Sequence, residues 1–415
     1  MMRNKAFLLF TLQLIFVFLP VRGGELQIIA TCDIHGKMQN FSKLATVIRQ
    51  YPNAVKIDLG DLFHGDPLND KLNGTAMIDA LNLLKYEIFI PGNHEFELPP
   101  ETLSGTLNRF KGQIAGQFRM PGVKSANWIL IRRPGFSCAV IGMTDHGLFR
   151  DRRFYPFMEI IDELTALDQA LAEIRKLDVD AIVLARHGGN YFSGVPTGMV
   201  LYRHPEIDLI ICGHTHKEIA GLRKGRCLIV QPGAFASSAI LVTLQKNPRN
   251  PVLIRSRLLR PGTGYDRQIS SLYFRESRRM AEQLATPVTA DPRRDSLPEQ
   301  IMEAMKKSAA AEAAVLELPE LPAEKLHYRK FLTLFPYRNN LAVIETTPAE
   351  YLKLRKERSS RLRRRYFTPP PEGKSAFNLV LNTFILSRSK VFPPERKFRI
   401  LPVIERDLIL KEFQR

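Results

Sequence analysis

The stretch "LQIIATCDIHG", residues 26–36, begins with an apolar run and ends with Asp33, His35 and a glycine. The run has the length and residue types of a buried strand, and Gly36 allows a sharp turn after it. Residues two positions apart in an extended segment project to the same side. The stretch therefore predicts a strand whose carboxyl end presents an aspartate and a histidine to one place.

Four more apolar runs of this chain end with polar side chains in the same way. These runs are "KIDLGDLFHG" (56–65), "FIPGNHEF" (89–96), "VLARHGG" (183–189) and "IICGHTH" (210–216), and they supply Asp61, Asn93, His94, His187, His214 and His216. Segments with helical spacing, residues 41–51, 74–86 and 158–177, lie between the runs. The alternation predicts a layered α/β domain from residue 25 to about residue 261. The carboxyl ends of parallel strands meet at one edge, so these side chains are expected to lie together.

The donors in this set are carboxylate, amide and imidazole groups, which suit manganese, zinc, iron or cobalt. Thiolates are not among them. The four cysteines, Cys32, Cys138, Cys212 and Cys227, lie in apolar runs and form no Cys-x-x-Cys pair. They are predicted to be buried free thiols. Asp58 falls inside its predicted strand and is not assigned to a metal.

The ordered motifs "DIHG", "GDLFHG", "GNHEFE" and "GHTH" resemble those of the calcineurin-like metallophosphoesterases, and within them the 5′-nucleotidase group. The resemblance implies an αββα catalytic domain that binds two divalent cations. One cation would be held by Asp33, His35, Asp61 and His216, and the other by Asp61, Asn93, His187 and His214. His94 would stabilise transition-state charge or protonate the leaving oxygen. Glu97 would orient His94, at a position where the group has an aspartate.

This resemblance predicts an exported phosphoesterase of nucleotide catabolism that hydrolyses a small phosphorylated substrate, possibly a nucleotide, by metal-hydroxide attack. One alternative is a hydrolase of a non-nucleotide or sulfur-containing ester. The other is an envelope protein that binds metal without turnover. A nucleic-acid partner is not expected: the net charge is +18, but the basic run at 361–367 lacks interleaved aromatics and is typical of a solvated face.

The chain is predicted to have four parts. Residues 1–23 combine a basic start, a short apolar centre and a small-residue exit, which is typical of a signal peptide and indicates a periplasmic or secreted protein without a stable membrane span. The catalytic domain (25–261) and a helical linker (262–295) follow. A smaller α+β domain (296–415) is predicted to contain a helix over 296–318, a strand over 339–347 and a helix over 348–357.

The second domain determines the substrate in the 5′-nucleotidase group, which it resembles in "LTLFPYRNNLAVIETTPAEYLKL", residues 332–354. From Leu297 onward the only glycine is Gly373, so the group's glycine-rich nucleoside clamp is predicted to be missing. Phe335, Tyr337 and Phe392 could stack on a base but are better explained as packing or surface residues. His64, His146, His204 and His327 match no ligand position and are interpreted as structural.

Overall fold

The computed structural model describes residues 24–145, 157–189, 191–192, 195–247, 252–280, 287–288, 297–319, 326–327, 331, 334–335, 339–357, 363–393 and 396–413. The predicted signal peptide (1–23), His146, Tyr337 and much of the linker after residue 280 lie outside these ranges. Within the described residues, no helix combines the length and the hydrophobicity needed to cross a bilayer.

Two sheets form the centre of the first domain. The first has the order β17 (Leu253–Leu259), β16 (Ala239–Gln245), β1 (Glu25–Thr31), β2 (Val55–Asp58), β3 (Ile88–Phe89), β4 (Gln113–Ala115), β6 (Ser125–Ala126). The second has the order β14 (Ile219–Lys224), β15 (Cys227–Gln231), β13 (Leu209–Cys212), β10 (Ala181–His187), β8 (Phe136–Thr144), β7 (Trp128–Arg133). The strands β1, β2 and β3 run parallel, as do β8, β10 and β13. The parallel strands therefore bring their carboxyl ends to one edge.

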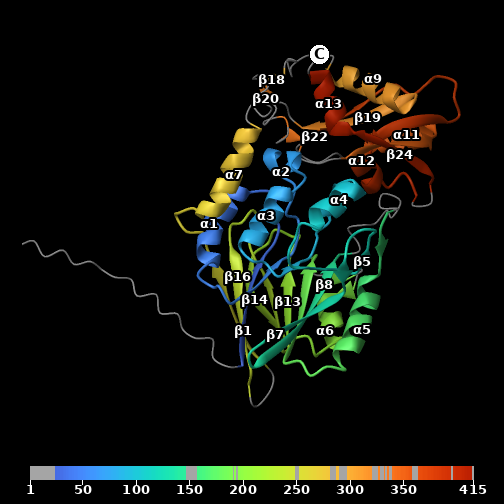
Figure 1. Ribbon diagram of the computed structural model, residues 1–415. Coiled ribbons are helices and arrows are strands. Elements are labelled where there is room, and N and C mark those ends of the chain that lie inside the picture. Colours follow the sequence, from blue (N-terminus) through green and yellow to red (C-terminus); the bar gives the residue numbers. More distant parts are fainter. Residues whose placement is uncertain are drawn as a thin grey trace, which may run out of the picture.

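The sheets stack face to face with helices outside, which gives the predicted αββα layers (Figure 1). Side chains of both sheets, including Ile57 and Val183, share one buried core. The outer face of the first sheet packs against α1 (Met38–Ile48), α3 (Thr75–Leu83) and α4 (Pro100–Leu107), and α7 (Arg267–Arg279) packs against α1 and α3. The outer face of the second packs against α5 (Glu163–Ile174) and α6 (Thr197–Arg203).

A five-stranded sheet organises the second domain. Its order is β22 (Arg363–Phe367), β19 (Ala313–Pro319), β23 (Phe377–Asn382), β21 (Asn340–Thr346), β24 (Phe398–Ile404). One face packs against α9 (Leu297–Ala309) and α13 (Glu405–Phe413), and the other against α11 (Pro348–Lys356) and α12 (Thr383–Arg388). The predicted strand at 339–347 and helix at 348–357 are confirmed as β21 and α11.

The helix predicted over 296–318 is wrong in its second half. Helix α9 ends at Ala309, and residues Ala313–Pro319 form strand β19. Alternate residues of β19 are buried on opposite faces: Ala314 and Leu316 on one, Ala313 and Val315 on the other. A strand buried on both faces shows no polar–apolar alternation, and its alanines resemble those of a helix.

The four cysteines are buried and free, as predicted. Each lies among apolar residues of the first domain, and burial raises the pKa of every one of these thiols above its usual range. They therefore behave as small core side chains rather than as nucleophiles or metal ligands.

Candidate metal centre

The structure brings the seven predicted ligand residues to one edge of the stacked sheets. Asp33 and His35 follow β1, Asp61 follows β2, Asn93 follows β3, His187 ends β10, and His214 and His216 follow β13. Two groups could each hold a metal ion: Asp33, His35 and His216, and Asp61, His187 and His214. In each group the ligand atoms all lie within 4.8 Å of one another.

Asp33 and His35 fall in one group, whereas His214 and His216 fall in different groups, and the prediction that both pairs project from extended strands is wrong. Strand β1 ends at Thr31 and β13 at Cys212, so both pairs lie in loops. Five of these residues have left-handed backbone conformations, with φ of 51° (Asp33), 50° (His35), 52° (Asp61), 71° (His214) and 56° (His216). Residues with side chains adopt this conformation at a cost, and such strain concentrates at functional sites. The donors converge through turned loops.

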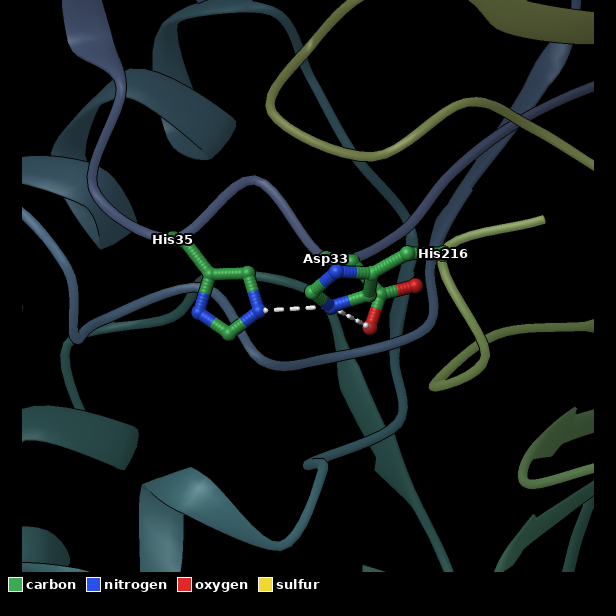
Figure 2. A group of neighbouring side chains, drawn as sticks. All are labelled: Asp33, His35 and His216. Atoms are coloured by element: carbon green, nitrogen blue, oxygen red, sulfur yellow. Dashed lines mark hydrogen bonds and ion pairs between the residues drawn. The ribbon is translucent and has the colours of Figure 1, made fainter. Parts of the chain in front are cut away.

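In the first group, two imidazoles and a carboxylate face one another (Figure 2). The Nε2 atoms of His35 and His216 are 3.1 Å apart, and His216 Nε2 lies 3.6 Å from Asp33 Oδ1. His35 Nδ1 donates to the His64 carbonyl oxygen at 3.1 Å. With Nδ1 as the donor, the Nε2 lone pair of neutral His35 points into the group, as in histidines that bind metals.

The second group is more deeply buried and repeats this arrangement. His187 Nε2 lies 3.2 Å from Asp61 Oδ2 and 3.3 Å from Asn93 Oδ1. His187 Nδ1 donates to the Leu59 carbonyl oxygen at 2.6 Å, which directs Nε2 toward the other donors. Gly92 permits this packing: a Cβ there would meet Asp61 Oδ1 at 2.3 Å and His187 Cε1 at 2.7 Å.

The surroundings of the buried histidines shift their pKa values in opposite directions. Burial lowers the pKa of His35 and of His214 to about 4, so both rings are neutral at physiological pH. Burial acts in the same direction on His187, but the charge of Asp61 and the hydrogen bond to it raise the pKa of His187 to about 9. The neighbouring histidines also hold the pKa of Asp61 well below its usual range, against the effect of its burial. Neutral imidazoles and an ionised carboxylate are the forms that bind cations, so His35, His214 and Asp61 are ready to bind, whereas His187 would release a proton when a metal ion binds.

His94 and Glu97 lie beside both groups in the short 3₁₀ helix His94–Glu97. His94 Nδ1 is 2.6 Å from Glu97 Oε1, and the His94 backbone N–H donates to Asp61 Oδ1 at 3.0 Å. The His94 and His35 ring centroids are 5.6 Å apart. Glu97 is thus placed to orient His94, with one methylene more than the aspartate of the resembled group.

The structure adds Glu95, a residue that the sequence analysis did not single out. Its two carboxylate oxygens are buried and accept hydrogen bonds from the backbone N–H groups of Asp61, Leu62, Phe63 and Gly92 at 2.7–3.2 Å. Glu95 therefore ties the loop of Asp61 to the loop of Asn93. Glu95 is the last residue of the "GNHE" motif, so the sequence marks its position. Its hydrogen-bond partners could not be predicted, because they depend on the conformation of the Asp61 loop.

A second residue that was not predicted is Phe235, in the loop between β15 and β16. Its ring is 42% exposed, and its centroid lies 5.4 Å from that of His35 and 5.0 Å from that of His216. Its φ of 58° is rare for a bulky residue. Phe235 thus presents an aromatic surface at the rim of the first group.

Three other residues considered from the sequence, Asp58, Phe335 and Phe392, have structural partners. Asp58 ends β2 and accepts hydrogen bonds from Thr31 and the Gly60 backbone, consistent with leaving it out of the ligand set. Phe335 packs on Phe331, and Phe392 belongs to the buried core of the second domain. Neither aromatic ring is therefore available to stack on a base.

The comparisons with known proteins agree with this architecture. Residues 26–218 match the family model described as calcineurin-like phosphoesterase. A Haemophilus influenzae 2′,3′-cyclic-nucleotide 2′-phosphodiesterase/3′-nucleotidase is 24% identical over 243 residues, covering 46% of this chain and 36% of that protein. The chain therefore spans little more than a third of this relative's length.

Two solved structures resemble nearly the whole chain. A Thermus thermophilus 5′-nucleotidase precursor superposes with a TM-score of 0.66 at 15% identity, covering 94% of this chain and 96% of the other. A Thermus thermophilus sulfate thiohydrolase superposes with a TM-score of 0.63, also at 15% identity, covering 95% of each chain. At these identities, the likeness establishes the two-domain fold.

Proposed function

Residues 26–218 belong to the calcineurin-like phosphoesterases, and from this premise we propose that the protein is a dinuclear-metal phosphoesterase that hydrolyses small phosphate esters. The observation that carries the proposal is the pairing of two adjacent ligand groups with His94, which touches Asp61 through its backbone but belongs to neither group. A site that only stored metal would have no use for an oriented imidazole beside its ligands.

The donor set fits two divalent cations. Carboxylate oxygens and imidazole nitrogens of each group already converge, and backbone carbonyls hold His35 and His187 in the tautomer that binds metal. Asp33, His35 and His216 would hold one ion, with His187, His214 and Asn93 around the other and Asp61 between them. When bound, two such ions supply Lewis-acid polarisation of the phosphoryl group and of a water molecule.

The protein's own residues would perform three tasks in this reaction. Asp61 would hold the two ligand groups at a fixed separation, because its Oδ2 atom faces His187 at 3.2 Å while its backbone carbonyl accepts from the His35 N–H at 2.9 Å. His94 would stabilise transition-state charge or give a proton to the leaving oxygen. Glu97, through His94 Nδ1, would hold the ring in the required orientation.

Nucleotides are one candidate substrate class, suggested by the nucleotide-processing relative. A sulfur-containing ester is the second, suggested by the fold shared with the sulfate thiohydrolase. The burial of Phe335 and Phe392 counts against nucleotides, because neither ring can stack on a base. The signal-like residues 1–23 support action outside the cytoplasm, in the periplasm or after secretion.

The test compares phosphate release from 4-nitrophenyl phosphate and from AMP, using protein without residues 1–23 loaded with manganese. Asp61→Asn is the control, and its circular dichroism should match that of the wild type. Cleavage of either ester that disappears in Asp61→Asn supports the proposal, and a preference for AMP assigns nucleotides. Full activity of Asp61→Asn would refute it. Cleavage of an organic thiosulfate alone would favour the sulfur chemistry.

A further inference from the structure

A buried chain of polar side chains connects the second domain with the candidate metal centre. Arg406, in α13, donates from Nη1 to Asp70 Oδ2 at 3.1 Å, and Asp70 Oδ1 lies 3.0 Å from His64 Nδ1. Asp70 belongs to α2 (Pro67–Lys71) of the first domain. The three residues are only 2–4% exposed. Arg406 also reaches the Phe335 carbonyl oxygen at 3.3 Å.

The chain leads to the pair formed by His94 and Glu97. The His64 and His94 ring centroids are 6.3 Å apart, and the rings are nearly perpendicular. His64 Nε2 and Glu97 Oε2 are both buried, and neither has a hydrogen-bond partner among the described residues. Burial by itself raises the pKa of Glu97, but His94, and then His64, lower it below its usual range.

Two features indicate that these buried polar residues have a role beyond packing. Burying an arginine, a carboxylate and an imidazole together costs free energy that apolar side chains of similar volume would not cost. The side chain of Glu97 is also one methylene longer than the aspartate of the resembled group, and only its Oε1 atom is used to hold His94. Its second oxygen needs a partner, because an unsatisfied buried carboxylate oxygen is destabilising.

We propose that His64 is a positioning residue for the His94–Glu97 pair, and that Asp70 and Arg406 hold it there from the second domain. Glu97 Oε2 can only accept and is not hydrogen-bonded directly to His64 Nε2, so a water molecule between the two atoms would carry the contact. The second domain thereby sets the geometry of His94 through α13. The inference rests on the proposed function in one respect, that His94 acts on the ester.

A double-mutant cycle tests whether His64 acts through Glu97. His64→Phe should lower kcat for 4-nitrophenyl phosphate about tenfold with little change in KM, as for residues that orient a functional group from behind. In a Glu97→Gln background, the same substitution should cost almost nothing further, because the group through which it acts is already disabled. Equal losses in both backgrounds would overturn the proposal.

A spectroscopic measurement tests the contacts from Arg406 through Asp70 and His64 to His94 without depending on activity. In the zinc-loaded full chain labelled with ring-¹⁵N histidine, the proton on His94 Nδ1 should shift in Arg406→Met and return in Arg406→Lys. Arg365→Met is the matched control, because Arg365 pairs with buried Glu317 at 2.9 Å inside the second domain. An unmoved His94 signal in Arg406→Met would refute the coupling, even if His64→Phe failed to fold. If the wild type cleaves no ester, the proposed function fails while this measurement still decides the positioning.

Discussion

Glu95 joins the loops that carry Asp61 and Asn93, and its removal tests how far the metal centre is preorganised. Glu95→Gln leaves one acceptor oxygen, so some of the four backbone N–H groups lose their partner. We expect metal affinity to fall about 10- to 100-fold. Each buried N–H left without a partner should cost about 1–3 kcal/mol of stability.

Titration calorimetry with zinc and thermal unfolding measure these two effects. Glu101→Gln, the same substitution at an exposed position of α4, is the control and should change neither quantity. Unchanged metal affinity in Glu95→Gln would show that the loops keep their conformation without the carboxylate.

Phe235 offers an aromatic surface where the organic part of an ester would emerge from the first ligand group. Phe235→Ala should raise KM for 4-nitrophenyl phosphate about 2- to 10-fold through lost aromatic contact. KM for glycerol phosphate, which has no ring, should stay unchanged. Phe274→Ala, at a 60% exposed position of α7, is the control. An equal effect on both substrates would show that Phe235 acts on the histidines instead of the substrate.

His187, at the end of β10, makes the metal-free protein sensitive to pH. Its pKa is raised from 6.5 to about 9 by Asp61, despite its burial. Protonated His187 beside Asp61 therefore stabilises the folded protein fully below pH 6.5, and this contribution is lost as the pH rises through about 9. Urea unfolding of the metal-free protein between pH 6 and pH 9.5 should show this loss, and His187→Asn should lack it. A wild-type profile parallel to that of His187→Asn would contradict the interpretation.

The strands of the first domain were predictable as short apolar runs followed by turn residues, and several helices as segments with helical spacing. Helix α11 was expected at 348–357, and its Thr347–Glu350 capping box is a local sequence signal. Strand β19 was missed because its alanines continue the alanine-rich pattern of α9, and no glycine or proline separates the two elements. The left-handed turns at Asp33 and His214 were missed as well, since aspartate and histidine adopt this conformation only occasionally, although more often than most residues with side chains.

The residues that meet in the candidate metal centre were predictable, whereas the contacts that support them were not. The ligand candidates stand at strand ends in recognisable motifs, so a shared edge follows from topology. Glu95 bonds to Asp61, His64 faces His94 and Phe235 packs on His35. The members of each pair are at least 30 residues apart in the chain, so no local pattern encodes these contacts. The Arg406–Asp70 contact spans 336 residues and depends on how the two domains pack.

The molecule has a continuous core across its two predicted domains. One buried cluster includes Leu44 of α1, Ile269 of α7, Ile301 of α9 and Ile409 of α13. Helix α7, which lies within the predicted linker (262–295), is thus packed against the first domain. Its cap Asp266 pairs with Arg49 and accepts from the backbone of Gln268 and Ile269. We therefore propose that the first domain extends through α7 rather than ending at residue 261.

Two truncated chains distinguish these boundaries. Residues 24–261 should melt at a lower temperature than residues 24–280, because only the longer fragment buries Ile269, Leu272 and Tyr273 of α7. Each of these side chains contributes about 1.5–3 kcal/mol when fully buried. Both fragments lack the second domain, so the surface around Asp70 is exposed equally in each. Circular dichroism melts measure the difference. Equal melting temperatures would mean that α7 is a connector and that residue 261 ends the first domain.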